Sequence, residues 1–173
     1  MRNPLLLSLC FLPLTLAQTQ TGLIDSELKL PQWLDLNAEA RWRAEGQHDN
    51  GFIAGNNQDF LLQRFRVGLG VKPTSWLRFY GQLQDARSPG IPNATASTRN
   101  TLDLRQAYVD IGHEDQWWDV KAGRQVLAFG SERVIGAGNW TNPGREFDAV
   151  KLGVHHGANR VDLFSSTVVV TNA

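Results

Sequence analysis

The chain of 173 residues has almost no cysteine and no net charge. Its single cysteine is Cys10, close to the N-terminus, and its 17 basic side chains balance 17 acidic ones. One cysteine excludes a small extracellular module stapled by disulfides. A neutral total gives no indication of a nucleic-acid partner. Any function must therefore depend on how the charges are arranged along the chain.

Helical periodicity and catalytic motifs are also absent from the sequence. No segment of helical period and useful length follows residue 32, and there is no glycine-rich phosphate motif, nucleophile elbow or metal-spaced cluster. His155 and His156 are consecutive, so on a strand they point to opposite faces and cannot share a metal ion. Glu146 and Asp148 share one face, yet no cleft beside them is defined. We expect no enzyme activity, no catalytic residue, no metal and no cofactor.

The N-terminus has the features of a secretory signal peptide. A short positive segment precedes an apolar run, and small residues end at Ala17, so residues 1–17 are expected to be removed. A single-pass anchor is the alternative, but Pro4 and Pro13 interrupt a run already shorter than the roughly 20 residues that a membrane helix needs. A lipoprotein is disfavoured because Leu9, before Cys10, is not small. These features predict export to a Gram-negative periplasm or outer membrane.

After a polar lead at residues 18–32, apolar and polar residues alternate in successive segments, which predicts β-strands. The segments with this rhythm are residues 33–44, 59–73, 76–87, 102–112, 117–130, 146–156 and 160–170. Tight turns near 73, 113 and 157 alternate with long loops near 50, 94 and 137, as in outer-membrane barrels. Several strands reach about 10 to 12 residues, longer than is usual in globular sheets. The fold class expected is all-β: an antiparallel up-and-down transmembrane β-barrel, of which six to seven strands are present.

Arginine makes up 13 of the 17 basic residues and lies at alternate positions inside apolar runs. Arg64 and Arg66 occupy one parity of the strand at 59–73. An arginine facing hydrocarbon at the midplane costs about 2 to 4 kcal/mol, so this parity must face inward. We expect both side chains to be solvated in a lumen. The same argument turns three more arginines inward: Arg41, Arg43 and Arg78.

The alternation is broken in the segment at residues 102–112. Leu102 and Leu104 share a parity there with Gln106 and Tyr108. A β-bulge or a strand end near residue 105 would restore two consistent faces.

Three stretches of the sequence resemble the alginate-export family of outer-membrane β-barrels. They are DLRQAYVDI at 103–111, VKAGRQVLAFGSERVIG at 120–136 and NWTNPGREFDAVKLGV at 139–154. The resemblance extends over roughly residues 33 to 170 and is most specific between 102 and 152. It implies a barrel of about 18 strands, within the range of outer-membrane barrels, whose arginine-lined lumen passes an anionic polysaccharide such as alginate.

Carried over position by position, the resemblance adds further residues of the lumen or constriction, with Asp148 as a salt-bridge partner. The complete set expected to line the solute path is Arg64, Arg66, Arg78, Arg105, Arg124, Arg133, Arg145 and Asp148. Six or seven strands cannot close a barrel of that size, because diameter depends on strand number. We therefore expect residues 33–173 to be the N-terminal portion of a longer barrel.

The function expected is an outer-membrane channel for passive passage of anionic solutes. Its expected partners are outer-membrane lipid, an anionic solute or polysaccharide and periplasmic export proteins, with no nucleic acid. The alternative is a secreted or surface β-sandwich that binds carbohydrate without transporting it. In that case the arginines would pair with acidic residues on a solvated face.

Overall fold

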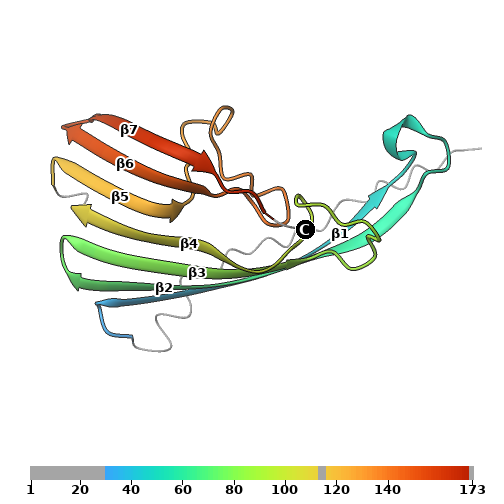
Figure 1. Ribbon diagram of the computed structural model, residues 1–173, viewed down its shortest axis with the longest axis horizontal. Helices are drawn as coiled ribbons and strands as arrows, with labels where there is room; N and C mark the ends of the chain where they lie inside the picture. Colours follow the sequence, from blue (N-terminus) through green and yellow to red (C-terminus); the bar gives the residue numbers. More distant parts are fainter. Residues whose placement is uncertain (1–29, 113–115, 172–173) are drawn as a thin grey trace, which may run out of the picture.

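A computed structural model describes residues 30–112 and 116–171 of the chain. The expected signal peptide and nearly all of the polar lead lie outside these residues. The strands form a single antiparallel sheet in which each pairs with its neighbours in sequence (Figure 1). They are β1 (Leu34–Gln47), β2 (Gln58–Thr74), β3 (Leu77–Arg87), β4 (Asn100–Gly112), β5 (Trp118–Gln125), β6 (Phe147–His156) and β7 (Asn159–Val168). The expected all-β, up-and-down arrangement is confirmed.

Helical structure in the described residues is limited to one short 3-10 turn, Asn50–Phe52, in the connection between β1 and β2. Across residues 30–112 and 116–171, no helix has the length and apolar character needed to cross a membrane.

Strand register separates two faces with different chemistry. Ala40 of β1 lies opposite Phe65 of β2, whereas Glu39 lies opposite Arg66. The face with Phe65 is called the outer face, and the face with Arg66 the inner face. Large apolar side chains remain exposed on the outer face along most of the sheet, including Trp42, Phe65, Val67, Leu69, Phe79, Leu83, Leu104, Val150, Val154, Val161 and Leu163.

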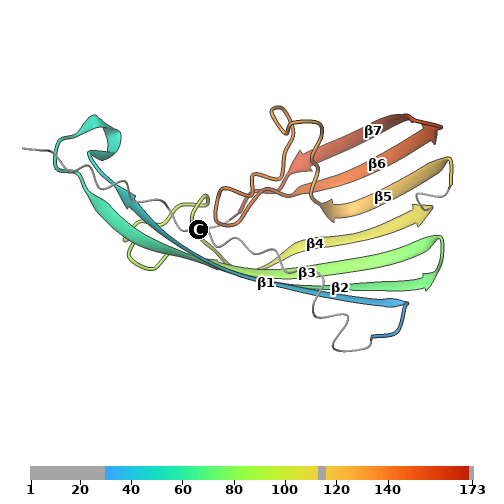
Figure 2. The ribbon, with the colours of Figure 1, turned by 180° about the vertical axis from the view of Figure 1, so that it is seen from behind.

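The sheet is curved like a trough. In Figures 1 and 2 it bends from β1, β2 and β3 on one side to β6 and β7 on the other. The connection between β5 and β6, residues 126–146, reaches the inner face of β1 and β2, where arginine side chains bind it. A loop that leaves β5 can reach β1 over so short a path because the sheet curves around it.

The expected β-bulge lies in β4. Leu83 of β3 pairs with Leu104, and Gln82 pairs with Gln106, which leaves Arg105 as an extra residue between them. The bulge lets Arg105 and Gln106 both turn toward the inner face, where each side chain donates to Gln82 Oε1. It thereby repairs the alternation that the sequence breaks.

Strand β5 is shorter than the alternation predicts. It ends at Gln125, whereas the sequence pattern continues to Gly130. The apolar residues after Gln125 leave the sheet because Leu127 and Phe129 pack instead on the inner face of β6. The long loop therefore begins at residue 126 and not near 131.

Three exposed tryptophans lie at one end of the sheet, beside the short turns. The carbonyl oxygens of Trp33, Trp76 and Trp117 accept backbone N–H groups of Lys72, Gly112 and His155, respectively. Each bond extends the pairing past the end of a strand at the same end of the sheet. A row of tryptophans at one margin of an apolar band is typical of a membrane interface.

Candidate functional site

Glu39 compensates a cluster of positive charge on the inner face of β1 and β2. Arg41 lies directly opposite Arg64 in the register, which places two like charges side by side. Glu39 Oε1 accepts Arg64 Nε at 2.9 Å and also its Nη2, while Glu39 Oε2 accepts Arg66 Nη1 at 3.1 Å. Both guanidinium groups therefore share one carboxylate.

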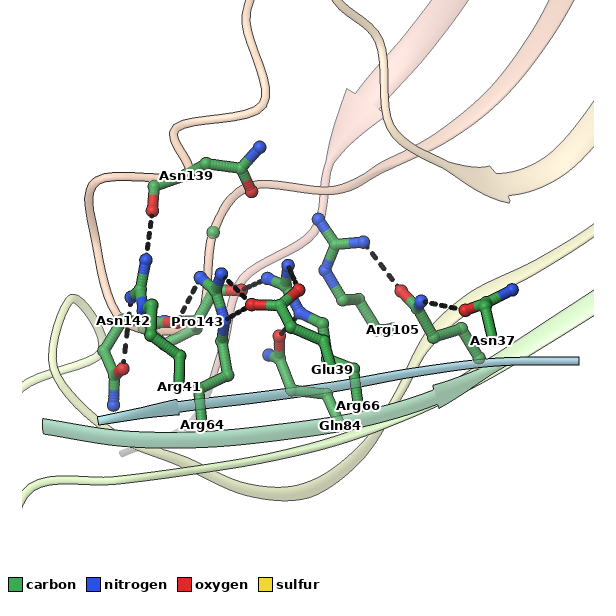
Figure 3. Close-up of polar contacts among 12 residues, drawn as sticks. Asn37, Glu39, Arg41, Arg64, Arg66, Gln84, Arg105, Asn139, Asn142 and Pro143 are labelled. Atoms are coloured by element: carbon green, nitrogen blue, oxygen red, sulfur yellow. Dashed lines mark hydrogen bonds and ion pairs between the residues drawn. The ribbon is translucent and has the colours of Figure 1, made fainter. Parts of the chain in front are cut away.

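The remaining donors of these arginines bind the loop at residues 126–146. Five consecutive backbone carbonyls of this loop accept guanidinium N–H groups. Figure 3 shows Arg41, Arg64 and Arg66 beside Asn139, Asn142 and Pro143 of the loop. The bonds run from Arg41 to Asn139 O (2.9 Å) and Thr141 O (3.3 Å), from Arg43 to Trp140 O (2.7 Å), from Arg64 to Asn142 O (3.1 Å) and from Arg66 to Pro143 O (2.8 Å). We call Arg41, Arg43, Arg64 and Arg66 the arginine clamp.

Asn142 fixes the same part of the loop from the other side. Its side chain is completely buried, and Nδ2 contacts the carbonyl oxygens of Gln63, Arg87 and Thr98 at 3.0, 3.0 and 2.9 Å. Its backbone N–H donates to Ser97 O at 3.0 Å. Asn142 thus joins the loop to β2, to β3 and to the connection between β3 and β4.

A second, apolar anchor holds the beginning of the loop over β6 and β7. Leu127 is 2% exposed and packs with the buried side chains of Phe147 and Ala149, with Phe129 and Ile135 against them. The ring of Phe129 also stacks on Phe164 of β7, with centroids 5.1 Å apart. The apolar anchor consists of Leu127, Phe129, Ile135, Phe147, Ala149 and Phe164.

Arg105 and Glu146 form the most deeply buried ion pair of the site. Arg105 Nε lies 2.9 Å from Glu146 Oε1, and the two side chains are only 5% and 3% exposed. Burial raises the pKa of the Glu146 carboxyl above its ordinary value, although the positive charge of Arg105 acts in the opposite direction. The pair joins the last residue of the loop to the bulge of β4.

The inner face toward the short turns is lined by alternating charges. A hollow of about 880 Å³ lies there, and its walls include Arg78, Lys121, Lys151 and Arg160. Each of these cations has an acidic partner. The shortest contacts are Arg78 to Asp35 (2.7 Å), Lys121 to Asp110 (3.5 Å), Lys151 to Asp162 (3.6 Å) and Arg160 to Asp119 (2.7 Å).

The expected inward orientation of Arg64, Arg66 and Arg78 agrees with the register, and Arg105 joins them through the bulge. The expectation that Arg64 and Arg66 are solvated is wrong. They are 4% and 5% exposed, because the loop at residues 126–146 covers them.

Arg124 and Asp148 lie on the other face of the sheet. They are paired in the register, in the same parity as the outer-face residues Ala122 and Val150. The salt bridge expected for Asp148 is present, with Arg124 Nε 3.0 Å from Oδ1. The resemblance implies that this pair lies in the lumen. Strand parity corrects this, because it places both residues on the outer face.

Arg133 and Arg145 lie in the loop and are exposed. Within residues 30–112 and 116–171, neither side chain has an ion-pair partner. They differ in this respect from the arginine clamp, whose side chains are bound to the loop or to Glu39.

Two important residues of the site were not among the expected ones. Glu39 lies in the polar parity of β1 together with Arg41 and Arg43, so the alternation could have identified it. Asn142 carries no comparable signal, because its role depends on three backbone carbonyls from distant segments.

Comparison with known proteins gives one match. A family model described as alginate export matches residues 32–173 of the chain. No curated protein matches the chain. No solved structure matches it either.

Proposed function

Because the chain belongs to the alginate export family of outer-membrane export channels, we propose that its strands form part of a channel wall that passes anionic solutes. The two-faced sheet is the observation that carries this proposal. Its outer face exposes apolar side chains along most of the sheet, with the ion pairs Arg124–Asp148 and Arg87–Asp85 at the strand ends beside the long loops, while its inner face holds arginines and other polar groups. A sheet with these faces suits a wall between lipid and a polar interior.

A β-sandwich that binds carbohydrate is less well supported. Such a fold buries the apolar face of one sheet against a second sheet. All seven strands formed by the described residues belong to one sheet. Leu69, Leu83 and Val150 are therefore exposed on a face that lipid would cover.

Arginine at the centre of the outer face is expected to impair membrane insertion. Leu69 is 46% exposed in the apolar band. Leu69→Arg should make folding into bilayers less favourable by about 2 to 4 kcal/mol if the residue lies near the midplane. Thr74→Arg, at the end of β2, is the control and should cost about 1 kcal/mol or less. Equal losses in the two variants, measured by urea titration in lipid vesicles, would contradict a lipid-facing outer face.

The proposed solute is anionic because the exposed side chains of the loop include two arginines. A guanidinium group can bind a carboxylate through two parallel hydrogen bonds. Arg133 and Arg145 are exposed on this loop, and Arg78 is partly exposed in the hollow near the turns. We propose these three as the residues that a passing anion meets.

Charge reversal in the loop tests the solute class. Arg133→Glu with Arg145→Glu should shift ion selectivity from anions toward cations, because two exposed positive charges become negative. Reversal potentials of the whole protein in planar bilayers give the measurement, and the shift should shrink as salt increases. Arg87→Glu is the control, because Arg87 is exposed at the end of β3 and lies in the parity of the outer face. An unchanged reversal potential in the double variant would refute the anionic solute.

A further inference from the structure

We propose that residues 126–146 are a strap that narrows the channel, and that the arginine clamp holds this strap and does not bind the solute. This inference rests on the proposed channel function. It assigns Arg41, Arg43, Arg64 and Arg66 a positioning role, and it makes the loop itself the element that limits the size of the solute.

The strap crosses the inner side of the trough from one margin toward the other. Its first part is held on β6 and β7 by the apolar anchor. Its second part, residues 139–143, is held on β1 and β2 by the arginine clamp. Glu146 then returns the chain to β6 beside Arg105. A segment attached at both margins of a curved sheet occupies part of the space that the sheet encloses.

The geometry of the arginine clamp requires arginine and not only positive charge. The side chain of Arg41 reaches Asn139 O through Nη1 and Thr141 O through Nη2. Arg66 reaches three groups at once, namely Gln84, Glu39 and Pro143. A guanidinium has five N–H donors in a fixed plane, whereas the ammonium group of lysine is a compact point charge with three donors. Lysine would keep the charge but lose most of these bonds.

Burial separates Arg64 and Arg66 of the clamp from the solute path, and its other two arginines, Arg41 and Arg43, are partly buried. Arg64 and Arg66 are almost inaccessible, and their donors are directed to Glu39, Gln84 and the carbonyls of the strap. An anion could displace these contacts only by lifting the strap. The exposed arginines therefore select the charge of the solute, whereas the clamp holds the strap that limits the size of the solute.

Replacement of clamp arginines by lysine tests the strap without changing the charge. In Arg64→Lys with Arg66→Lys, the strap should detach, so that single-channel conductance rises and larger oligosaccharides enter liposomes, while anion preference stays the same. Arg87→Lys is the matched control, because Arg87 forms a similar fork onto Asp85 on the opposite face. Its conductance should equal that of the unmodified protein.

Release of the strap can also be measured chemically. Ala137 is 5% exposed within the strap, and Cys10 is the only cysteine of the sequence. In the A137C variant, the thiol should react slowly with a charged maleimide. Adding R64K and R66K should raise the rate by about tenfold or more, since each lost bond to a charged group is equivalent to roughly a tenfold change. Arg87→Lys should leave the rate unchanged.

The outcomes distinguish the strap from the channel itself. Conductance and labelling that both remain unchanged in the lysine variant would overturn the strap. If no variant conducts but labelling rises as expected, the strap is supported while the proposed function fails. If the double variant does not fold, Arg43→Lys, whose bond to Trp140 O lies at an exposed position, should give a smaller increase in labelling. If labelling of the Arg43→Lys variant does not increase, the inference is overturned.

Discussion

Arg105→Met should lower the free energy of unfolding by about 3 to 5 kcal/mol, because it leaves a buried carboxylate without its partner. Glu146 is 3% exposed as a side chain, and Arg105 is the cation 2.9 Å from it. Methionine fills similar space but cannot compensate the charge. Urea unfolding of the whole protein in lipid vesicles, followed by tryptophan fluorescence, gives the measurement.

The loss of unfolding free energy in Arg105→Met should depend on pH. Burial raises the pKa of the Glu146 carboxyl above its ordinary value of 4.5 even beside Arg105, and removing Arg105 should raise it further. The folded state then retains a proton that the unfolded state releases, so stability falls as the pH rises from 4.5 through the raised pKa. The variant should be least destabilised near pH 4 and most destabilised above that pKa.

A double variant distinguishes the uncompensated charge from lost packing. Arg105→Met combined with Glu146→Leu removes both charges, and buried ion pairs replaced by apolar residues are often neutral in stability. The double variant should therefore regain most of the lost stability, and its stability should show no pH dependence from this pair. If Arg105→Met is equally destabilised at low and high pH, then an unpaired carboxylate is not the cause.

Asn142→Asp is expected to detach the strap and to destabilise the protein by at least about 2 kcal/mol, because it removes both N–H donors of Nδ2. The substitution keeps the shape but replaces the Nδ2 donor with an oxygen. Three carbonyl oxygens, of Gln63, Arg87 and Thr98, would then face an acceptor in a fully buried site. Each buried carbonyl left without a donor costs about 1 kcal/mol or more. The same unfolding assay and labelling of A137C measure both effects.

Asn139→Asp is the matched control for this substitution. Asn139 lies three residues earlier in the strap, is exposed, and contributes its backbone carbonyl to Arg41. The same chemical change there should alter stability by less than about 0.5 kcal/mol. Similar losses in the two variants would mean that added negative charge, and not the lost donor, is responsible.

Much of the sheet could be predicted because alternation is a local property of the sequence. Apolar residues at every second position predicted that Arg64 and Arg66 lie on the face of the sheet away from Phe65, and the register confirms this. The broken pattern in β4 predicted a bulge or a strand end near residue 105, and the register shows the bulge. In the regular strands, parity alone was sufficient to decide which side chains share a face.

The environment of the clamp could not be predicted from this pattern. The strap is recognised mostly through its backbone carbonyls, which every sequence has, so residues 139–143 carry little signal of the contact. Arg64 and Arg66 are buried by a loop nearly 80 residues later in the chain, so the pattern of their own strand does not reveal their burial. Arg124 was misplaced for another reason: similarity of a motif identifies a position, whereas the register decides its face.

The bulge at Arg105 gives β4 a tolerance to changes in length that a regular strand lacks. Deleting one residue from a regular strand moves every following side chain to the opposite face, so arginines would meet lipid and leucines the interior. Deleting Arg105 would instead make Leu104 and Gln106 neighbours, opposite Leu83 and Gln82, which already are neighbours. The sheet would stay in frame, while Glu146 would lose its ion-pair partner and Gln82 one of the two donors to its Oε1. Loss of one residue is therefore expected to be tolerated at this position as it is in the loops.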